Sequence, residues 1–235
     1  MSSPSPELFL SVDIGTTAMK VGLFTAGGKL IALSSQSYEL LKPRPGFVEL
    51  PVERYFEAFC AGVAECLAGQ QPEAVLAIGL SSQGQTLADF AEGMNPLTNA
   101  LSWLDTRATE ETRRLAEKFS REEFYQRTGV PNFNEIASAP KIMWLTRHQP
   151  EVFARTAKYL MLPDYLIWQL TGELVGDPQD LSSMALMDEG TGDWWPEMLE
   201  VVGVRPEQLP RIGKSGEVAG RILPVVAAKI GRAHV

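Results

Sequence analysis

The chain has 235 residues, an apolar fraction of 45% and a formal net charge of −8, values that are ordinary for a soluble globular protein. An acidic chain without a basic stripe argues against a nucleic-acid partner. No apolar run approaches membrane-spanning length, and residues 1–7 do not resemble a secretory signal, so we expect a cytoplasmic protein with no membrane partner.

Two apolar runs, residues 8–10 and 21–24, predict a pair of strands joined by a tight polar turn. The turn contains Gly15, which lets the backbone come close to a ligand, and successive backbone N–H groups in such a turn form an anion-binding concavity. Thr16, Thr17 and Lys20 add donors, and Asp13 is suited to ordering the water shell of Mg²⁺. Taken alone, the pattern fits an ordinary hairpin equally well.

The next elements extend this pair into a sheet. Residues 30–41 predict a third strand, and residues 51–69 predict a helix with apolar side chains at helical spacing. Residues 74–80 form a continuous apolar run, which predicts a buried strand parallel to the first. We therefore expect the order strand, strand, strand, helix, strand.

The second half of the chain alternates helices and short strands. Strands are expected at residues 87–90, 100–105 and 159–162, and one charged helix at residues 106–127. Further helices are expected from residue 139, at 163–170 and at 194–202, with a short polar-capped segment at 177–184. No convincing linker divides the chain, so we expect one elaborated α/β domain.

Polar residues follow two of these strands, where α/β sheets bind ligands. Gln83, Gly84 and Gln85 come after the fourth strand, and amide side chains suit a polyhydroxylated ligand because they both donate and accept. Trp103 could pack on the C–H face of a sugar or lie in the core. Asp105 could accept hydroxyl hydrogen bonds or cap the following helix. Gln83 could instead only stabilise its turn.

Six blocks in order resemble the FGGY carbohydrate kinases of the actin-like ATPase superfamily. They are the loop at 13–20, the strand-end motif at 78–83, Trp-Leu-Asp-Thr-Arg at 103–107, Pro-Lys-Ile-Met-Trp at 140–144, one block made of the segments at 162–166 and 170–173, and residues 215–220. The resemblance implies a ribonuclease-H-like (actin-like ATPase) fold with a mixed sheet and flanking helices. It also implies phosphorylation of a sugar or polyol hydroxyl with ATP and Mg²⁺.

The same resemblance assigns residue roles. Asp13, Gly15, Thr16, Thr17 and Lys20 would hold the ATP phosphates, with Asp13 binding Mg²⁺ through water. The sugar or polyol would contact the strand-end residues Gln83, Gly84, Gln85, Trp103 and Asp105. Glycerol kinases have Arg-Glu after this glutamine and xylulokinases have Met-His, so Gly84-Gln85 leaves the substrate open. Ile136-Ala137 also stands where an aromatic contact is usual.

The family's catalytic base is an Asp in a Gly-Gly-Asp motif that opens a C-terminal lobe, and this sequence has no such motif. We therefore expect residues 1–229 to be the N-terminal lobe, inactive alone and partnered by a C-terminal lobe. Residues 230–235 resemble a translated sequencing adapter and are expected to be non-biological. A homodimer is left open. The alternatives are a non-catalytic sugar-binding or regulatory domain and another actin-like branch.

Overall fold

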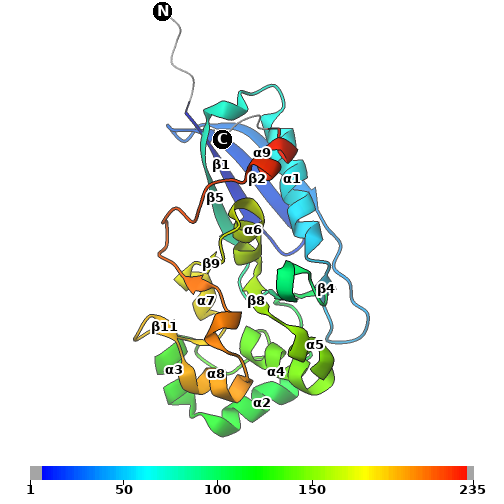
Figure 1. Ribbon diagram of the computed structural model, residues 1–235, viewed down its shortest axis with the longest axis vertical. Coiled ribbons are helices and arrows are strands. Elements are labelled where there is room, and N and C mark those ends of the chain that lie inside the picture. Colours follow the sequence, from blue (N-terminus) through cyan, green and yellow to red (C-terminus); the bar gives the residue numbers. More distant parts are fainter. Residues whose placement is uncertain (1–6, 232–235) are drawn as a thin grey trace, which may run out of the picture.

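The computed structural model describes residues 7–231, which form two four-stranded sheets and two short two-stranded sheets, with helices around them (Figure 1). The longer strands are β1 (Leu8–Ile14), β2 (Ala18–Thr25), β3 (Leu30–Ser37), β5 (Val75–Ser82), β6 (Leu87–Phe90) and β8 (Lys158–Met161), and the two-residue strands are β4 (Glu49–Leu50), β7 (Ala100–Leu101), β9 (Val175–Gly176), β10 (Met187–Asp188), β11 (Asp193–Trp194) and β12 (Arg211–Ile212), the last four of which form the two-stranded sheets β10-β11 and β12-β9. The helices are α1 (Glu53–Leu67), α2 (Thr109–Lys118), α3 (Arg121–Thr128), α4 (Ser138–His148), α5 (Pro150–Arg155), α6 (Leu162–Thr171), α7 (Pro178–Ser182), α8 (Pro196–Val202) and α9 (Pro224–Lys229).

The first sheet has the strand order β3-β2-β1-β5. The first three strands are antiparallel neighbours, and β5 is parallel to β1, as the order of elements predicts. In β1 the side chains alternate between buried and exposed, because helices cover one face of this sheet and leave the other open. Asp13 and Lys20 lie opposite each other in the register of β1 and β2, and both side chains are on the open face.

The prediction that the fourth strand is buried is wrong. Strand β5 is the edge of the first sheet, and Leu76 is 57% exposed. A continuous apolar run is typical of a strand that is covered on both faces, but burial depends on neighbours that the run itself does not specify. Among residues 7–231 no strand pairs with the second edge of β5.

Helix α1 covers the closed face of the first sheet, where it packs on β2 and β3. Gly62 lets the helix approach closely, because a Cβ atom there would lie 2.7 Å from Cγ2 of Val21. Helices α6 and α9 complete the same core, next to α1 in the upper half of Figure 1. Ile230 is buried in this core, so it packs like the rest of the domain; residues 232–235 of the predicted tail lie outside the described residues.

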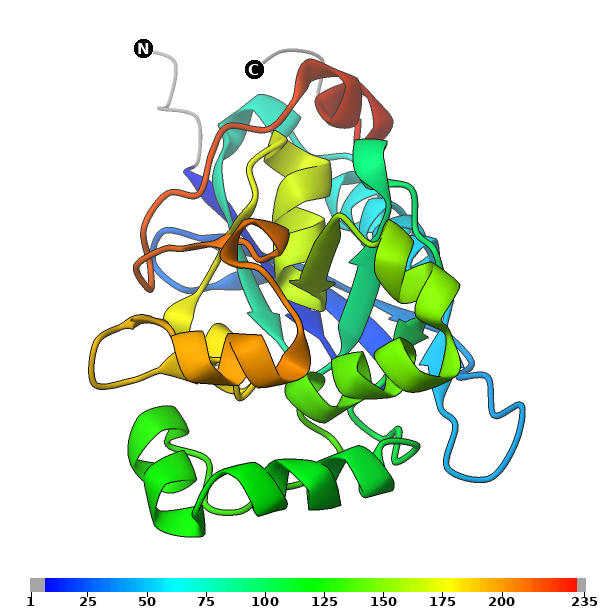
Figure 2. The ribbon, with the colours of Figure 1, turned by 60° about the horizontal axis from the view of Figure 1, so that its bottom comes forward.

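The second sheet has the order β4-β7-β6-β8 and connects the first sheet to a mainly helical half. In Figure 2 the helices α2 and α3 lie below α4 and α8, and a second core between them surrounds Trp195. The prediction of a single helix at residues 106–127 is wrong, because α2 ends at Lys118 and a separate helix, α3, follows it. Ser120 begins α3 by accepting a hydrogen bond from the N–H of Glu123, which is the usual geometry of a helix N-cap.

Within residues 7–231, no helix combines the length and the apolar character that crossing a bilayer would require. The predicted strand at residues 100–105 is also shorter than expected, since only Ala100 and Leu101 pair with neighbouring strands. The chain turns at residues 102–105, where the N–H of Asp105 donates to the carbonyl of Ser102. This turn brings Trp103 toward the first sheet.

Candidate active site

The loop between β1 and β2 is closed by a hydrogen bond from the N–H of Gly15 to the carbonyl of Ala18, 3.0 Å long. A Cβ atom at Gly15 would lie 2.7 Å from that carbonyl oxygen, so only glycine fits this turn. Among the hydrogen bonds of residues 7–231, none has the N–H of Thr16 or Thr17 as its donor. These two successive backbone donors have the arrangement that the predicted anion site requires.

Asp13 and Lys20 flank this loop as exposed side chains on the open face of the sheet. Within the part of the chain that the structure describes, no cluster of three or more His, Cys, Asp or Glu residues could hold a metal ion. A carboxylate that stands alone beside phosphate-binding donors suits Mg²⁺, which keeps several waters and takes other ligands from substrate phosphates. The residues present therefore fit the predicted metal.

The turn after β5 lies against this loop, because the N–H of Gln83 donates to the carbonyl of Ile14 at 2.9 Å. Gln85 has a φ angle of 64°, a left-handed conformation that is uncommon for a residue with a side chain. Gly84 lies close to α7, since a Cβ atom there would be 3.2 Å from Oγ of Ser183. The amide group of Gln83 is buried next to the hydroxyl of Tyr55, and neither its nitrogen nor its oxygen makes a hydrogen bond of good geometry among the described residues.

Trp103 joins the turn to the phosphate loop. Its indole Nε1–H donates to Oγ1 of Thr16 at 2.9 Å, and its backbone N–H donates to Oγ1 of Thr86 at 3.1 Å. A hydroxyl that accepts one hydrogen bond still has its own proton to donate. The hydroxyl of Thr16 is thus oriented by the indole, and its proton is available to a second acceptor such as a phosphate oxygen.

Asp105 is 0% exposed, and its two oxygens accept hydrogen bonds from within the protein. The donors are the N–H of Val48 at 2.6 Å and the guanidinium of Arg107 at 2.8 Å. Arg107 also pairs with Glu49 and lies 3.8 Å from the centre of the Phe47 ring. This geometry favours a structural role for Asp105, although not as a cap, because α2 begins after Ala108 without a side-chain cap.

Tyr38 and Lys141 are two residues near the site that sequence reasoning did not include. The hydroxyl of Tyr38 donates to the carbonyl of Gly15, and burial raises the pKa of this phenol, so it stays a donor. Lys141 donates to two carbonyls of the strand-end turns. A tyrosine directly after the polar second half of β3 gave a weak signal for the first. The signal for the second was a lysine at the start of an apolar helix.

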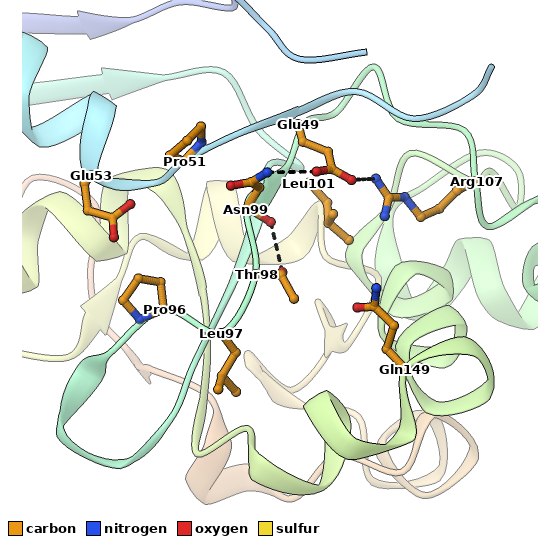
Figure 3. A pocket seen from close by; sticks show the side chains of 10 residues that line it. All are labelled: Glu49, Pro51, Glu53, Pro96, Leu97, Thr98, Asn99, Leu101, Arg107 and Gln149. Carbon is orange, nitrogen blue, oxygen red and sulfur yellow. Dashed lines mark hydrogen bonds and ion pairs between the residues drawn. The ribbon is translucent and has the colours of Figure 1, made fainter. Parts of the chain in front are cut away.

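Two hollows lie near these residues. One, of about 910 Å³, borders the phosphate loop at Thr17 and is otherwise lined by residues 37–42 and Leu104. The other, of about 490 Å³, is polar and contains the Glu49–Arg107 ion pair (Figure 3). Arg107 is also the ion-pair partner of Asp105, but none of the ten predicted phosphate and acceptor residues lines this second hollow.

Comparison with known proteins places the chain in a family. The profile of the FGGY family of carbohydrate kinases, N-terminal domain, matches residues 8–235. Gluconokinase of Bacillus subtilis is 30% identical over 94% of this chain, and xylulose kinase of Escherichia coli is 29% identical over 97%. A crystal structure of gluconate kinase from Lactobacillus acidophilus superposes on 98% of the chain with a TM-score of 0.91 and 27% identity.

These relatives are longer than the chain described above. The chain spans 43% and 46% of the lengths of the two kinases, and 47% of the solved gluconate kinase. The match confirms the expected actin-like ATPase fold with its mixed sheet and flanking helices, and it confirms the correspondence with an N-terminal lobe. The chain belongs to the FGGY family of carbohydrate kinases and corresponds to the N-terminal domain of that family.

Proposed function

We propose that the protein to which this chain belongs transfers the γ-phosphoryl group of ATP to a hydroxyl of a sugar or polyol. In this proposal the chain supplies the phosphate loop and the acceptor-binding turn. The catalytic base and the nucleoside site belong to a second lobe, which the longer relatives have the length to contain.

One observation carries the proposal: the predicted phosphate loop and the predicted acceptor residues, far apart in the sequence, meet in space. Gln83 reaches the loop through the carbonyl of Ile14, and Trp103 reaches it through the hydroxyl of Thr16. Phosphoryl transfer depends mainly on placing the acceptor oxygen in line with the phosphate and on stabilising charge. A direct connection between the two sites serves that requirement.

The residues of the loop would act by holding charge in place. The N–H groups and hydroxyls of Thr16 and Thr17 would donate to phosphate oxygens, and Lys20 would add a mobile positive charge without the fork geometry of arginine. Bound through water to Asp13, Mg²⁺ would neutralise charge on the transferred group. Gln85 and Gly84 would face the acceptor with Trp103 beside it.

The acceptor is proposed to be a polyhydroxylated molecule of the size handled by relatives. Those relatives include enzymes named gluconokinase, xylulose kinase and glycerol kinase. The buried, unpartnered amide of Gln83 supports a polar acceptor, because a buried amide without partners is costly unless a ligand or water satisfies it.

The test is an assay of the longer protein that contains this chain. ATP consumption would be scored against gluconate, xylulose, glycerol and related polyols, with the Asp13→Asn variant as the control. We expect consumption that depends on one acceptor and falls at least a hundredfold in the variant, because the metal-ordering carboxylate is lost. Acceptor binding without ATP consumption by the wild type would support the alternative, a non-catalytic sugar-binding protein.

A further inference from the structure

Lys141 is fully buried in the first turns of α4, yet it makes no ion pair within residues 7–231. Its ammonium nitrogen donates to two backbone carbonyls instead, that of Gln85 at 3.0 Å and that of Ser102 at 2.8 Å. These carbonyls belong to two different turns. One turn follows β5, and the other follows β7.

The position of Lys141 is electrostatically unfavourable. Burial is the main cause that lowers its pKa to about 7; the carboxylate of Asp105 only partly offsets this effect, and the guanidinium of Arg107 adds to it. The positive end of the helix dipole at the start of α4 also disfavours a cation. An apolar side chain of similar length would avoid both costs, so the two hydrogen bonds are the feature that distinguishes lysine here.

The two turns that Lys141 joins are those that carry the proposed acceptor contacts. Gln85, whose φ angle is 64°, is held in its uncommon conformation partly through its own carbonyl. Ser102 immediately precedes Trp103, and its carbonyl also accepts from the N–H of Asp105. The N–H of Trp103 already donates to Oγ1 of Thr86 between these turns, and the nitrogen of Lys141 adds a second link that both turns share.

We propose that Lys141 is a positioning residue that clips the turn at residues 83–86 to the turn at residues 102–105, and so fixes the width of the acceptor site. Its effect on acceptor binding rests on the proposed function, whereas the clip itself is a property of this chain. Lys141 acts through Gln85 and Trp103 and is not itself a contact of the reacting atoms.

The clip is tested with Lys141→Met, which keeps the length of the side chain and removes its donors. The control is Leu145→Ala on the same helix, which creates a cavity in the second core and removes no hydrogen bond to either turn. Amide hydrogen exchange and the ¹⁵N-indole resonance of Trp103, assigned as the peak missing from Trp103→Phe, would be recorded for both. We expect the amides of Gln83 and Trp103 to exchange at least tenfold faster, and the indole peak to move, only in Lys141→Met.

The same changes in Leu145→Ala, or their absence from a folded Lys141→Met, would overturn the proposal. A measurement on the unaltered chain covers the case in which Lys141→Met does not fold. Native-state exchange in increasing urea should then show the amides of Gln83 and Trp103 opening together, with one dependence on urea below that of global unfolding. Separate opening of the two amides would also exclude the clip.

The consequence for function is tested in the longer protein with gluconate, xylulose and glycerol as probes. Lys141→Met should raise the KM of the accepted compound about tenfold and leave the KM for ATP within twofold, whereas Leu145→Ala should change neither. Equal effects on both KM values would contradict a role specific to the acceptor site. If the wild type phosphorylates no acceptor, the proposed function fails, while the exchange data still decide whether the clip exists.

Discussion

At the scale of single residues, Trp103 has the most informative contact because it joins the acceptor turn to the phosphate loop. Its indole N–H is the donor that orients the hydroxyl of Thr16. The sequence offered two interpretations of this residue, a sugar-stacking aromatic or ordinary core. The structure adds a third function, since the indole N–H also donates a hydrogen bond to Thr16 in the predicted phosphate loop.

Trp103→Phe should therefore lower the activity of the longer protein about tenfold, which corresponds to about 1.4 kcal/mol in the transition state. The phenyl ring can still pack on a sugar, but Thr16 loses the donor that fixes its hydroxyl. Steady-state kinetics would measure the effect as a fall in kcat. Trp194→Phe, at the half-buried β11, is the control; equal losses in both variants would rule out a role for the Thr16 contact.

Asp164 predicts a dependence of stability on pH. Burial raises its pKa from an ordinary value of 3.8 to about 8, and one of its oxygens has no partner among the described residues. The folded chain then binds a proton at Asp164 that the unfolded chain releases above pH 4. The contribution of Asp164 to the free energy of unfolding therefore falls as the pH rises from about 4 to 8.

Asp164→Asn removes that titration and should make the free energy of unfolding depend less on pH. Between pH 5 and pH 7 the variant should lose about 2 kcal/mol less of its free energy of unfolding than the wild type does. Urea unfolding at both pH values would measure this difference. Asp193→Asn, an exposed substitution in β11, is the control, and identical slopes for the two variants would show that Asp164 does not titrate in this range.

At the scale of elements, the approach of α1 to the first sheet depends on a glycine. Gly62 is buried, and a Cβ atom there would overlap Cγ2 of Val21 at 2.7 Å. Val21 is fully buried and β-branched, so it has little freedom to move aside. The cost of glycine in a helix is offset here by close packing between helix and sheet.

Gly62→Ala should thus destabilise the chain by about 1–2 kcal/mol, although alanine is the better helix former. At the neighbouring exposed position the substitution in the other direction, Ala61→Gly, should destabilise the chain by about 1 kcal/mol through helix propensity alone. Thermal and urea unfolding of both variants would separate packing from propensity. If Gly62→Ala were more stable than the wild type, α1 would be able to move away from β2 without a loss of packing energy.

The ion pairs around Arg107 connect three elements. Arg107 pairs with Asp105 in its own turn and with Glu49 in β4, and it lies 4.9 Å from the ring of Trp144 in α4. Its side chain is only 3% exposed, so the pair is shielded from water. Removing the cation would leave the carboxylate of Asp105 buried without its partner.

Arg107→Met should therefore cost about 3–5 kcal/mol, the range for breaking a buried pair. The matched surface variant is Arg54→Met, because Arg54 pairs with Glu57 while both side chains are mostly exposed, and it should cost less than 1 kcal/mol. Chemical unfolding would measure both. Similar losses in the two variants would show that burial does not strengthen the Arg107 pairs.

At the scale of the whole molecule, the proposed function makes this chain one side of a site that a second lobe would complete. It spans under half of the kinases that it resembles, and the Gly-Gly-Asp motif expected to hold the base does not occur in it. We expect ATP consumption by the 235-residue chain to stay at background with gluconate, xylulose or glycerol. Robust turnover by this chain would refute the two-lobe interpretation, and activity of the longer protein is the positive control.

The sequence alone determined the local parts of this protein. Gly15 within a polar turn between apolar strands was sufficient to predict a tight turn, because such a turn is specified by neighbouring residues, whereas its interpretation as a phosphate loop came from the family resemblance. The same is true of the helix at 53–67 and of the parallel relation between the first and fourth strands. The family followed from six such local motifs in order.

Only the tertiary structure decided what depends on distant neighbours. The apolar run of β5 proved to be an exposed edge because no described strand pairs beyond it. The carboxylate of Asp105 proved to be buried, with hydrogen bonds from the guanidinium of Arg107 and the N–H of Val48. Lys141 illustrates the same limit most clearly. Its two acceptors are backbone carbonyls, which every residue possesses, so no sequence pattern could identify the turns that it holds together.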